Sequence, residues 1–201
     1  MRPHYLNKLF APRSIAVFGA SERAGSVGGQ VFQNLLDAGF DGELLPINPK
    51  HDELFGRPCY ASLADIGQFV DMVVVATPAP TVPGIVRECG EAGVEAAVII
   101  SAGFGEAGGE GKRLERELVE YARYYGVRLL GPNGLGVMRP RAGINATFSH
   151  NSAEAGNLAL VSQSGALCTA ILDWARPHHV GFSAMVSLGD AVDVDFGDLL
   201  D

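Results

Sequence analysis

The sequence has few of the features that mark secreted, metal-binding or membrane proteins. Its three cysteines, Cys59, Cys89 and Cys168, form no C-x-x-C pair and have no histidine at ligand spacing. We therefore expect reduced thiols, most of them small core residues, and no metal site. No N-terminal signal pattern is present, and no run approaches the roughly 18 apolar residues that a membrane span needs. These absences lead us to expect a cytoplasmic protein with no membrane segment.

Positive charge is also scarce in this chain. Fifteen lysines and arginines stand against 23 acidic residues, which gives a net charge of -8 without a basic stripe. Nucleic acid is therefore not expected as the main partner. The 47% apolar and 19% charged residues are typical of a globular protein. A length of 201 residues allows one large domain or about one and a half ordinary ones.

The clearest pattern present is a strand, a glycine-rich turn, a helix and a second strand between Ser14 and Lys50. The first strand is the apolar run Ile15–Phe18, the turn spans Gly19–Gly29, the helix Val31–Ala38 and the second strand Glu43–Ile47. Glycine after the first strand lets the backbone approach a phosphate, and the N–H groups of the following helix face that anion. The pattern therefore predicts a nucleotide-phosphate site at residues 19–29.

The residues that follow these two strands bear on which nucleotide is bound. A dinucleotide fingerprint would have its second glycine where Ser21 stands, and an acid at the end of the second strand. That strand ends instead in Asn48, with Lys50 beyond it. A lysine there suggests a phosphorylated ribose, which both NADP and coenzyme A carry. The alternative is an ordinary surface lysine after a proline turn.

Strands and helices go on alternating as far as residue 136. Further strands are expected at 71–76, 96–100 and 127–130, with a long amphipathic helix at 109–125. This alternation predicts a parallel sheet with right-handed crossovers, whose ligands bind at the carboxyl ends of the strands. A cleft is therefore expected where five small, polar or glycine-rich loops leave that edge, beginning at Gly19, Asn48, Thr77, Ser101 and Gly131.

The remaining residues read as a connection and a second, incomplete unit. Residues 137–156 show no clear strand or helix. After them come a strand at 157–161, a helix at 166–175 and a strand at 181–186. A helical pattern restarts at Asp193 and stops at Asp201 without a C-cap. Because two strands are too few for a doubly wound domain, we expect a truncated chain.

Six short motifs occur along the chain in a fixed order. They are Ser14-Ile-Ala-Val-Phe-Gly-Ala-Ser21, Ile47-Asn-Pro-Lys50, Ala76-Thr-Pro78, Ser101-Ala-Gly-Phe-Gly105, Gly131-Pro-Asn133 and Val161-Ser-Gln-Ser-Gly165. Together they resemble the N-terminal part of NDP-forming acyl-CoA synthetases, the superfamily of succinyl-CoA synthetase α subunits and ADP-forming acetyl-CoA synthetases. The later Ile171-Leu-Asp-Trp-Ala175 and Ser187-Leu-Gly-Asp190 resemble a branch in which this region remains an active ligase or is fused to an acetyltransferase domain, as in Pat-type protein lysine acetyltransferases.

The resemblance implies an α/β fold in three parts. These are a Rossmann-like, doubly wound CoA-binding domain over residues 1–140, a connection over 141–156, and the first part of a flavodoxin-like domain of the succinyl-CoA synthetase type over 157–201. It also implies coenzyme A or acyl-CoA as the ligand and a small carboxylic acid as the co-substrate. The expected partner is the rest of the same chain or an ATP-grasp subunit. Assembly into a homo-oligomer is left as a possibility.

The family mechanism passes a phosphoryl group from a nucleoside triphosphate to a histidine and then to the acid, before CoA attacks the acyl phosphate. The family's histidine lies beyond residue 201, and the ATP-grasp domain that binds ATP or ADP with magnesium is absent from this chain. No catalytic residue is therefore assigned. This part of the protein is expected to bind CoA without turning it over.

The resemblance places the cofactor along the loops at the carboxyl edge. Ser21 is expected to donate a hydrogen bond through its hydroxyl, and Lys50 is expected near the 3′-phosphate. For the loop that begins at Ser101, the alternative is an ordinary loop without a ligand. The expected cofactor-binding residues are Gly19, Ala20, Ser21, Gly25, Asn48, Lys50, Ala76, Thr77, Pro78, Ser101, Ala102, Gly103, Phe104 and Asn133.

A second anion site is expected at the turn Ser162-Gln-Ser-Gly165. In the synthetases the equivalent turn meets a phosphohistidine at a helix N-terminus, and Ser162, Ser164 and Gly165 match it. The alternative is plain N-capping by Ser164. A serine hydrolase is not indicated, because the glycine before the serine is missing.

Two other functions are compatible with the sequence. The parent protein could be an acetyltransferase whose synthetase-like region only senses acetyl-CoA. From a different class, the chain could be an NAD(P)-binding oxidoreductase or redox-sensor domain, although the second glycine and the acid of that fingerprint are missing.

Overall fold

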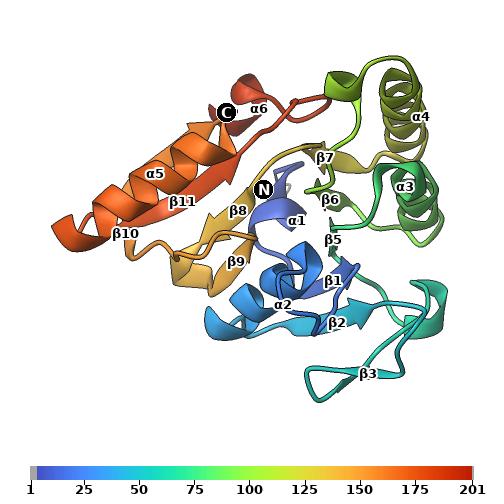
Figure 1. Ribbon diagram of the computed structural model, residues 1–201, viewed down its shortest axis with the longest axis horizontal. Helices are drawn as coiled ribbons and strands as arrows, with labels where there is room; N and C mark the ends of the chain where they lie inside the picture. Colours follow the sequence, from blue (N-terminus) through green and yellow to red (C-terminus); the bar gives the residue numbers. More distant parts are fainter. Residues whose placement is uncertain (1–3, 201) are drawn as a thin grey trace.

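The computed structural model describes residues 4–200, and a five-stranded parallel sheet forms its centre (Figure 1). The order in space is β2-β1-β5-β6-β7. The strands are β1 (Ser14–Phe18), β2 (Glu43–Ile47), β5 (Met72–Val75), β6 (Ala96–Ile99) and β7 (Arg128–Leu130). All four neighbouring pairs run parallel, which confirms the α/β fold expected from the alternating pattern. Residues 1–3 and 201, which the predicted domain limits include, lie outside the described residues.

Helices cover both faces of this sheet, so its strands are buried on both sides. The helices α3 (Val82–Glu91) and α4 (Gly109–Tyr125) lie on one face, and α1 (Asn7–Phe10) and α2 (Val27–Asp37) on the other (Figure 1). Every residue of β1, β5 and β6 is buried. This is why these strands read as continuous apolar runs in the sequence. One apolar cluster fills each side of the sheet.

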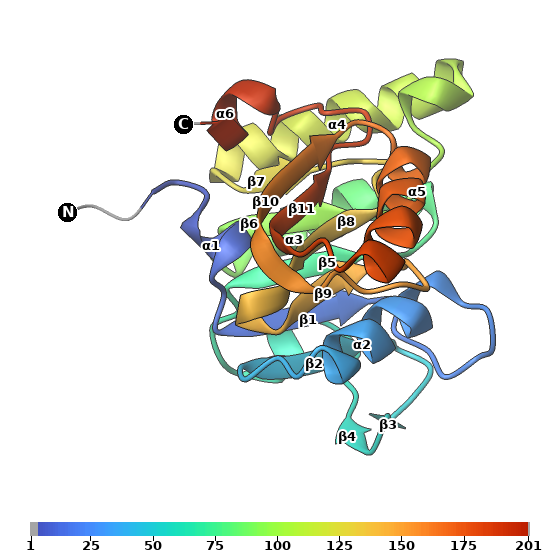
Figure 2. The same ribbon diagram turned by 90° about the vertical axis from the view of Figure 1, so that its left-hand side faces the viewer.

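A second, four-stranded sheet packs over the face that carries α2 (Figure 2). Its order is β10-β11-β8-β9, with β10 and β11 parallel and the other two pairs antiparallel. The strands are β8 (Gly136–Arg139), β9 (Ile144–Thr147), β10 (Ala155–Ser162) and β11 (Phe182–Ser187), and the accompanying helices are α5 (Gly165–Ala175) and α6 (Phe196–Leu200).

The remaining elements are short. A small antiparallel pair, β3 (Glu53–Leu54) with β4 (Arg57–Pro58), follows β2. Single 3₁₀ turns span Ala64–Ile66, Ala79–Thr81, Gly105–Ala107, Pro140–Ala142 and Arg176–His178.

The structure corrects the prediction that residues 137–156 hold no strand. Within that stretch β8 and β9 pair with each other, and β8 also pairs with β11. Local pattern missed them because Asn145 and Thr147 are polar yet buried, and the Thr147 hydroxyl donates to Asn145 Oδ1 at 2.7 Å. Pairing with distant strands makes this segment regular. The proposed domain limits at 140 and 156 stay predictions.

The helix after β1 begins four residues earlier than the sequence indicated. It starts at Val27, so Gly28 lies in its first turn rather than in the loop. Ser26 caps it, with its hydroxyl oxygen accepting from the N–H of Gly29 at 3.3 Å. The last helix, α6, begins at Phe196 instead of Asp193.

The cysteines behave largely as small core residues. All three are free, and Cys89 and Cys168 are buried whereas Cys59 is half-buried. Burial raises the pKa of each of these thiols above its ordinary value. Within residues 4–200 no helix is long and apolar enough to cross a membrane.

Candidate functional site

Five loops meet at the carboxyl edge of the central sheet, where two neighbouring cavities open. One cavity has a volume of about 780 Å³ and lies against the loops after β1 and β2. The other has about 660 Å³ and lies against the loops after β6 and β7 and the start of α5. Both are lined by Val27, Ala76 and Thr77. The two cavities therefore form one elongated cleft along the edge at which the sequence predicted a site.

The first cavity gathers half of the predicted cofactor residues. These are Gly19, Ser21, Asn48, Lys50, Ala76, Thr77 and Pro78. The first turn of α2 also lines it, through Ser26, Val27 and Gly28. The positive end of a helix dipole therefore faces this cavity, an arrangement that favours a phosphate.

Two glycines allow the turn after β1 to pack closely against its surroundings. Gly19 has φ +86°, and a Cβ there would lie 2.7 Å from the carbonyl oxygen of Ala76. A Cβ on Gly28 would lie 2.0 Å from the carbonyl oxygen of Gly19. Real Cβ atoms do not approach that closely, so these positions need glycine for α2 to start directly beside β1.

Asn48 stands where an NAD enzyme would have its ribose-binding acid, and it supports the turn. Its side-chain Nδ2 donates to the carbonyl oxygen of Ala20 at 2.8 Å, and its Oδ1 accepts from the N–H of Lys50 at 3.1 Å. Ala20 is itself fully buried, so it acts through its backbone. Asn48 thus links the loops after β1 and β2 and fixes the backbone at Lys50.

Lys50 is joined at this cavity by a second cation that sequence reasoning missed. Arg23 lies in the glycine-rich turn and lines the same space, as does His51. In the part of the chain that the structure describes, neither Lys50 nor Arg23 takes part in a salt bridge. Both side chains are exposed. A lone arginine in a turn carries no sequence signal, and only the fold shows that it faces the cavity.

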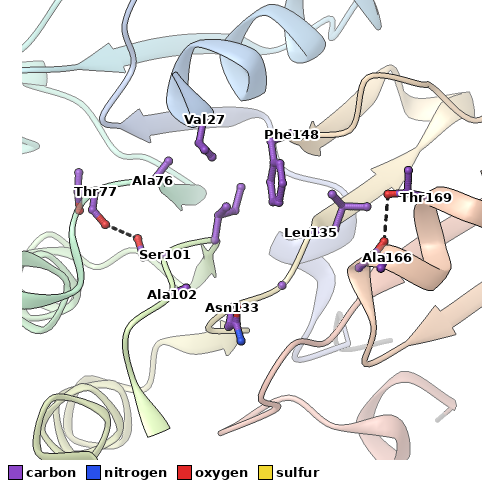
Figure 3. A pocket seen from close by; sticks show the side chains of 13 residues that line it. Val27, Ala76, Thr77, Ser101, Ala102, Asn133, Leu135, Phe148, Ala166 and Thr169 are labelled. Carbon is purple, nitrogen blue, oxygen red and sulfur yellow. Dashed lines mark hydrogen bonds between the residues drawn. The ribbon is translucent and has the colours of Figure 1, made fainter. Parts of the chain in front are cut away.

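The second cavity contains three more predicted residues, Ser101, Ala102 and Asn133 (Figure 3). The Ser101 hydroxyl donates to the carbonyl oxygen of Thr77 at 2.5 Å, which ties the loops after β5 and β6 together. The N–H of Asn133 donates to the carbonyl oxygen of Ser101 at 3.0 Å. The φ of +60° at Asn133 is a conformation that asparagine tolerates better than most residues.

Four of the predicted cofactor residues, Ala20, Gly25, Gly103 and Phe104, line neither cavity. The Phe104 side chain is fully buried in the core beside α4. The N–H groups of Gly103 and Phe104 donate to the Glu106 carboxylate instead of facing the cleft. Glu106 lies only two or three residues along the chain, and its carboxylate takes these donors, which no local sequence pattern indicated. Ligand contact by these four residues stays a prediction.

Carboxylates beside the second cavity carry shifted pKa values. Burial alone would raise the pKa of Glu106, but the N–H groups of Gly103 and Phe104 lower it below its ordinary value. The pKa of Asp190 is raised by burial and by the negative charges of Glu106 and Glu115, although Asn133 Nδ2 donates to Asp190 Oδ1 at 3.4 Å. Asp190 thereby joins the Asn133 loop to the segment after β11.

The predicted phosphate-facing turn is held by local hydrogen bonds. The Ser164 hydroxyl oxygen accepts from the N–H of Leu167 at 3.2 Å and caps α5. The Ser162 hydroxyl oxygen accepts from the N–H of Ser164 at 3.1 Å. Gly165 lines the second cavity. The geometry therefore shows the N-cap, and an anion at this turn stays a prediction.

The second cavity also has lining residues that the sequence did not single out. Leu135, Phe148, Ala166 and Thr169 come from the segments after β7 and β9 and from α5 (Figure 3). Phe148 belongs to the stretch that read as a connection, so no local pattern marked it.

Known proteins resemble the chain over nearly all of its length. The sequence model described as "CoA binding domain" matches residues 13–140, and that described as "Succinyl-CoA ligase like flavodoxin domain" matches residues 155–201. The acetate–CoA ligase [ADP-forming] I of Archaeoglobus fulgidus is 47% identical over 196 residues, which cover 98% of this chain and 28% of that protein. The α subunit of the acetate–CoA ligase [ADP-forming] I of Pyrococcus furiosus is 46% identical over 98% of this chain and 43% of its own.

A solved structure agrees with these sequence relatives. The dinucleotide-forming acetyl-coenzyme A synthetase 1 of Ca. Korarchaeum cryptofilum, in complex with phosphate and ADP, has a TM-score of 0.93 and 44% identity over 98% of this chain and 42% of that one. The chain thus spans less than half the length of each relative named here. It belongs to the CoA-binding domain family, and its Rossmann-like domain is followed by a flavodoxin-like domain of the succinyl-CoA ligase type.

Proposed function

We propose that the chain binds coenzyme A or an acyl-CoA along the cleft formed by the two cavities, as the N-terminal part of an ADP-forming acid–CoA ligase. The observation that carries the proposal is the cleft itself. It runs along the carboxyl edge of the sheet, with the cations Lys50 and Arg23 at one end and apolar side chains such as Leu135 at the other.

The lining fits the shape and charge of coenzyme A. This cofactor has a bulky, phosphorylated nucleotide and a thin pantetheine arm that ends in a thiol. The wide first cavity offers cations and a helix N-terminus, which favour phosphates. The residues that line both cavities are Val27, Ala76 and Thr77, and Ser101 and Ala102 follow in the second cavity. These mostly small side chains leave room for a narrow arm.

Each group of residues then has a defined task. Lys50 and Arg23 hold phosphate oxygens, and Ser21 supplies a hydroxyl. Asn48 and Ser101 fix the loops on which these groups stand. When bound, the cofactor supplies the thiol that accepts an acyl group, and the chain binds and orients it. We retain the turn Ser162–Gly165 as the proposed phosphate-facing turn of the complete protein.

For the complete protein we propose a ligase rather than an acetyl-CoA-sensing acetyltransferase. The relatives compared above are named as ligases or synthetases, and this favours the ligase parent. The small carboxylic acid, the ATP or ADP with magnesium and the ATP-grasp partner belong to that proposal. Detection of a phosphorylated histidine in the complete protein after incubation with ATP and magnesium would test it, and a complete protein without such a histidine would contradict it.

Isothermal titration calorimetry with CoA, dephospho-CoA, NAD and NADP tests the binding proposal. We expect CoA to bind, and dephospho-CoA to bind about 10- to 150-fold more weakly, because a charged hydrogen bond is worth about 1.5–3 kcal/mol. Lys50→Ala should weaken CoA binding and remove most of the difference between the two ligands.

Lys112→Ala is the matched control, because Lys112 is an exposed lysine of α4 that lines neither cavity. It should change neither affinity. Equal affinities of the unmodified chain for CoA and dephospho-CoA would show that Lys50 does not bind the 3′-phosphate. Binding of NAD or NADP without binding of CoA would favour the oxidoreductase reading and contradict the proposal.

A further inference from the structure

The second cavity has an uncharged, largely apolar end. Val27, Leu135 and Phe148 come from three separate segments, and their side chains point into the same space (Figure 3). None of the residues that line this cavity is charged. A carboxylate placed among Val27, Leu135 and Phe148 would therefore find no cationic side chain to pair with, whereas an apolar group there would be well accommodated.

Phe148 is the largest side chain of this lining, and it is not packed into the core. It is 37% exposed, although most phenylalanines are buried. Val27 and Leu135 lie on either side of its ring in the cavity wall (Figure 3). An aromatic side chain in this position limits how far a ligand can extend.

The backbone on both sides of Phe148 is fixed by one buried amide. Asn34 of α2 donates through Nδ2 to the carbonyl oxygens of Thr147 and Ser149, both at 2.8 Å. Its Oδ1 accepts from Gln30 Nε2 at 2.8 Å, so its side-chain amide has partners at both ends. Because a buried amide without partners is costly, this arrangement holds residue 148 in place rather than leaving it on a free loop.

We propose that Phe148 sets the size of the acyl group carried on the CoA thiol and that Asn34 is its positioning residue. The inference rests on the proposed CoA-binding function, in which the pantetheine arm leads from the cations into this cavity. It assigns the site to short, uncharged acyl groups. An apolar pocket typically discriminates by about 10- to 200-fold for each methylene that it excludes.

The test compares acyl-CoA affinities with the affinity for free CoA in the 201-residue chain, by calorimetry. The probes are CoA, acetyl-CoA, hexanoyl-CoA and succinyl-CoA. For the unmodified chain we expect acetyl-CoA to bind about as well as CoA, and hexanoyl-CoA and succinyl-CoA to bind at least about tenfold more weakly. Each ratio to CoA is independent of the fraction of folded protein.

Phe148→Ala should raise the affinity for hexanoyl-CoA relative to CoA about tenfold or more, and Phe148→Trp should lower this relative affinity. Asn34→Ala should shift the same ratio in the direction of Phe148→Ala, an effect that a merely structural role for Asn34 would not produce. Phe196→Ala is the matched control, because Phe196 is 43% exposed and lines neither cavity. It should leave every ratio unchanged.

The outcomes separate the two proposals. If the unmodified chain binds CoA but its acyl ratios are the same in Phe148→Ala and Phe148→Trp, the role of Phe148 is overturned and CoA binding stands. Tight binding of succinyl-CoA would overturn the assignment to uncharged acyl groups. If the unmodified chain binds no CoA at all, the proposed function and this inference both fall.

Discussion

The chain contains two strand–turn–helix units that look alike in sequence and differ in burial. In the first, β1 leads through a serine-capped turn into α2, and every residue of β1 is buried. In the second, β10 leads through another serine-capped turn into α5, but most of β10 is exposed or half-buried. Leu158 of β10 and Trp174 of α5 are 55% and 58% exposed. The same local pattern thus produces the same elements, whereas burial depends on the layers packed around them.

The largest expected difference concerns the aromatic residues of the two helices. Phe32 of α2 is fully buried and stacks on Phe55 with 4.8 Å between ring centroids. Phe32→Ala should lower the free energy of unfolding by about 3–5 kcal/mol, because it leaves a cavity. Trp174→Ala in α5 should cost at most about 1 kcal/mol, since that ring is more than half exposed and stacks on His178 at the surface. Urea unfolding followed by circular dichroism measures both, and equal costs would contradict the comparison.

A buried carboxylate that packs against the start of β1 should also matter more than an exposed one of the second unit. Asp71, beside β5, is buried and accepts from Lys8 Nζ at 2.6 Å and from the N–H of Arg13 at 2.7 Å. Asp71→Asn should cost about 1.5–3 kcal/mol of unfolding free energy near neutral pH. The exposed Asp173 of α5 provides the control, since Asp173→Asn should leave stability nearly unchanged.

The Asp71 contribution should also depend on pH. Burial alone would raise the pKa of Asp71, but the hydrogen bonds from Lys8 and Arg13 outweigh it and lower the pKa below its ordinary value. The stabilisation is therefore complete above the unfolded value of about 4 and is lost as the pH falls through the lower folded value. Unfolding free energies of the unmodified chain and Asp71→Asn should converge between pH 5 and the acid limit of folding. Curves that stay parallel would show that the charge of Asp71 does not stabilise the fold.

The glycines at the starts of the two helices should differ as well. A Cβ on Gly28 would meet the carbonyl oxygen of Gly19 at 2.0 Å, whereas one on Gly165 would meet Leu135 Cβ at 3.1 Å. We expect Gly28→Ala to cost about 1–3 kcal/mol and to weaken CoA binding, because backbone must shift. Gly165→Ala should cost less, because the overlap is much smaller and a shift of a few tenths of an ångström relieves it. Similar costs in urea unfolding would mean that α2 can move away from β1.

The contrast between the two regions also explains how far the sequence could be read. The first sheet was predictable because strands such as β5 and β6 are buried on both faces and appear as uninterrupted apolar runs. The strands β8 and β9 were not. In β9 the apolar Ile144 and Ala146 alternate with the buried polar side chains of Asn145 and Thr147, and β8 has only Val137 and Met138 between Gly136 and Arg139. Their pairing is set by a partner strand far along the chain.

The same division holds for the candidate site. Gly19, Asn48, Thr77 and Ser101 come within two residues of a strand end, so the topology alone places them at one edge. Phe148 lies between two residues whose carbonyl oxygens are bonded to Asn34 of α2, a tertiary contact without a local signal in the sequence.

A crystal structure of this chain grown with coenzyme A would show whether the cleft holds the cofactor, as we propose. The adenosine 3′-phosphate should lie within hydrogen-bond reach of Lys50 or Arg23, and the pantetheine arm should pass Thr77 and Ser101 toward Phe148. A nucleotide bound anywhere other than the carboxyl edge of the parallel sheet would contradict the proposal.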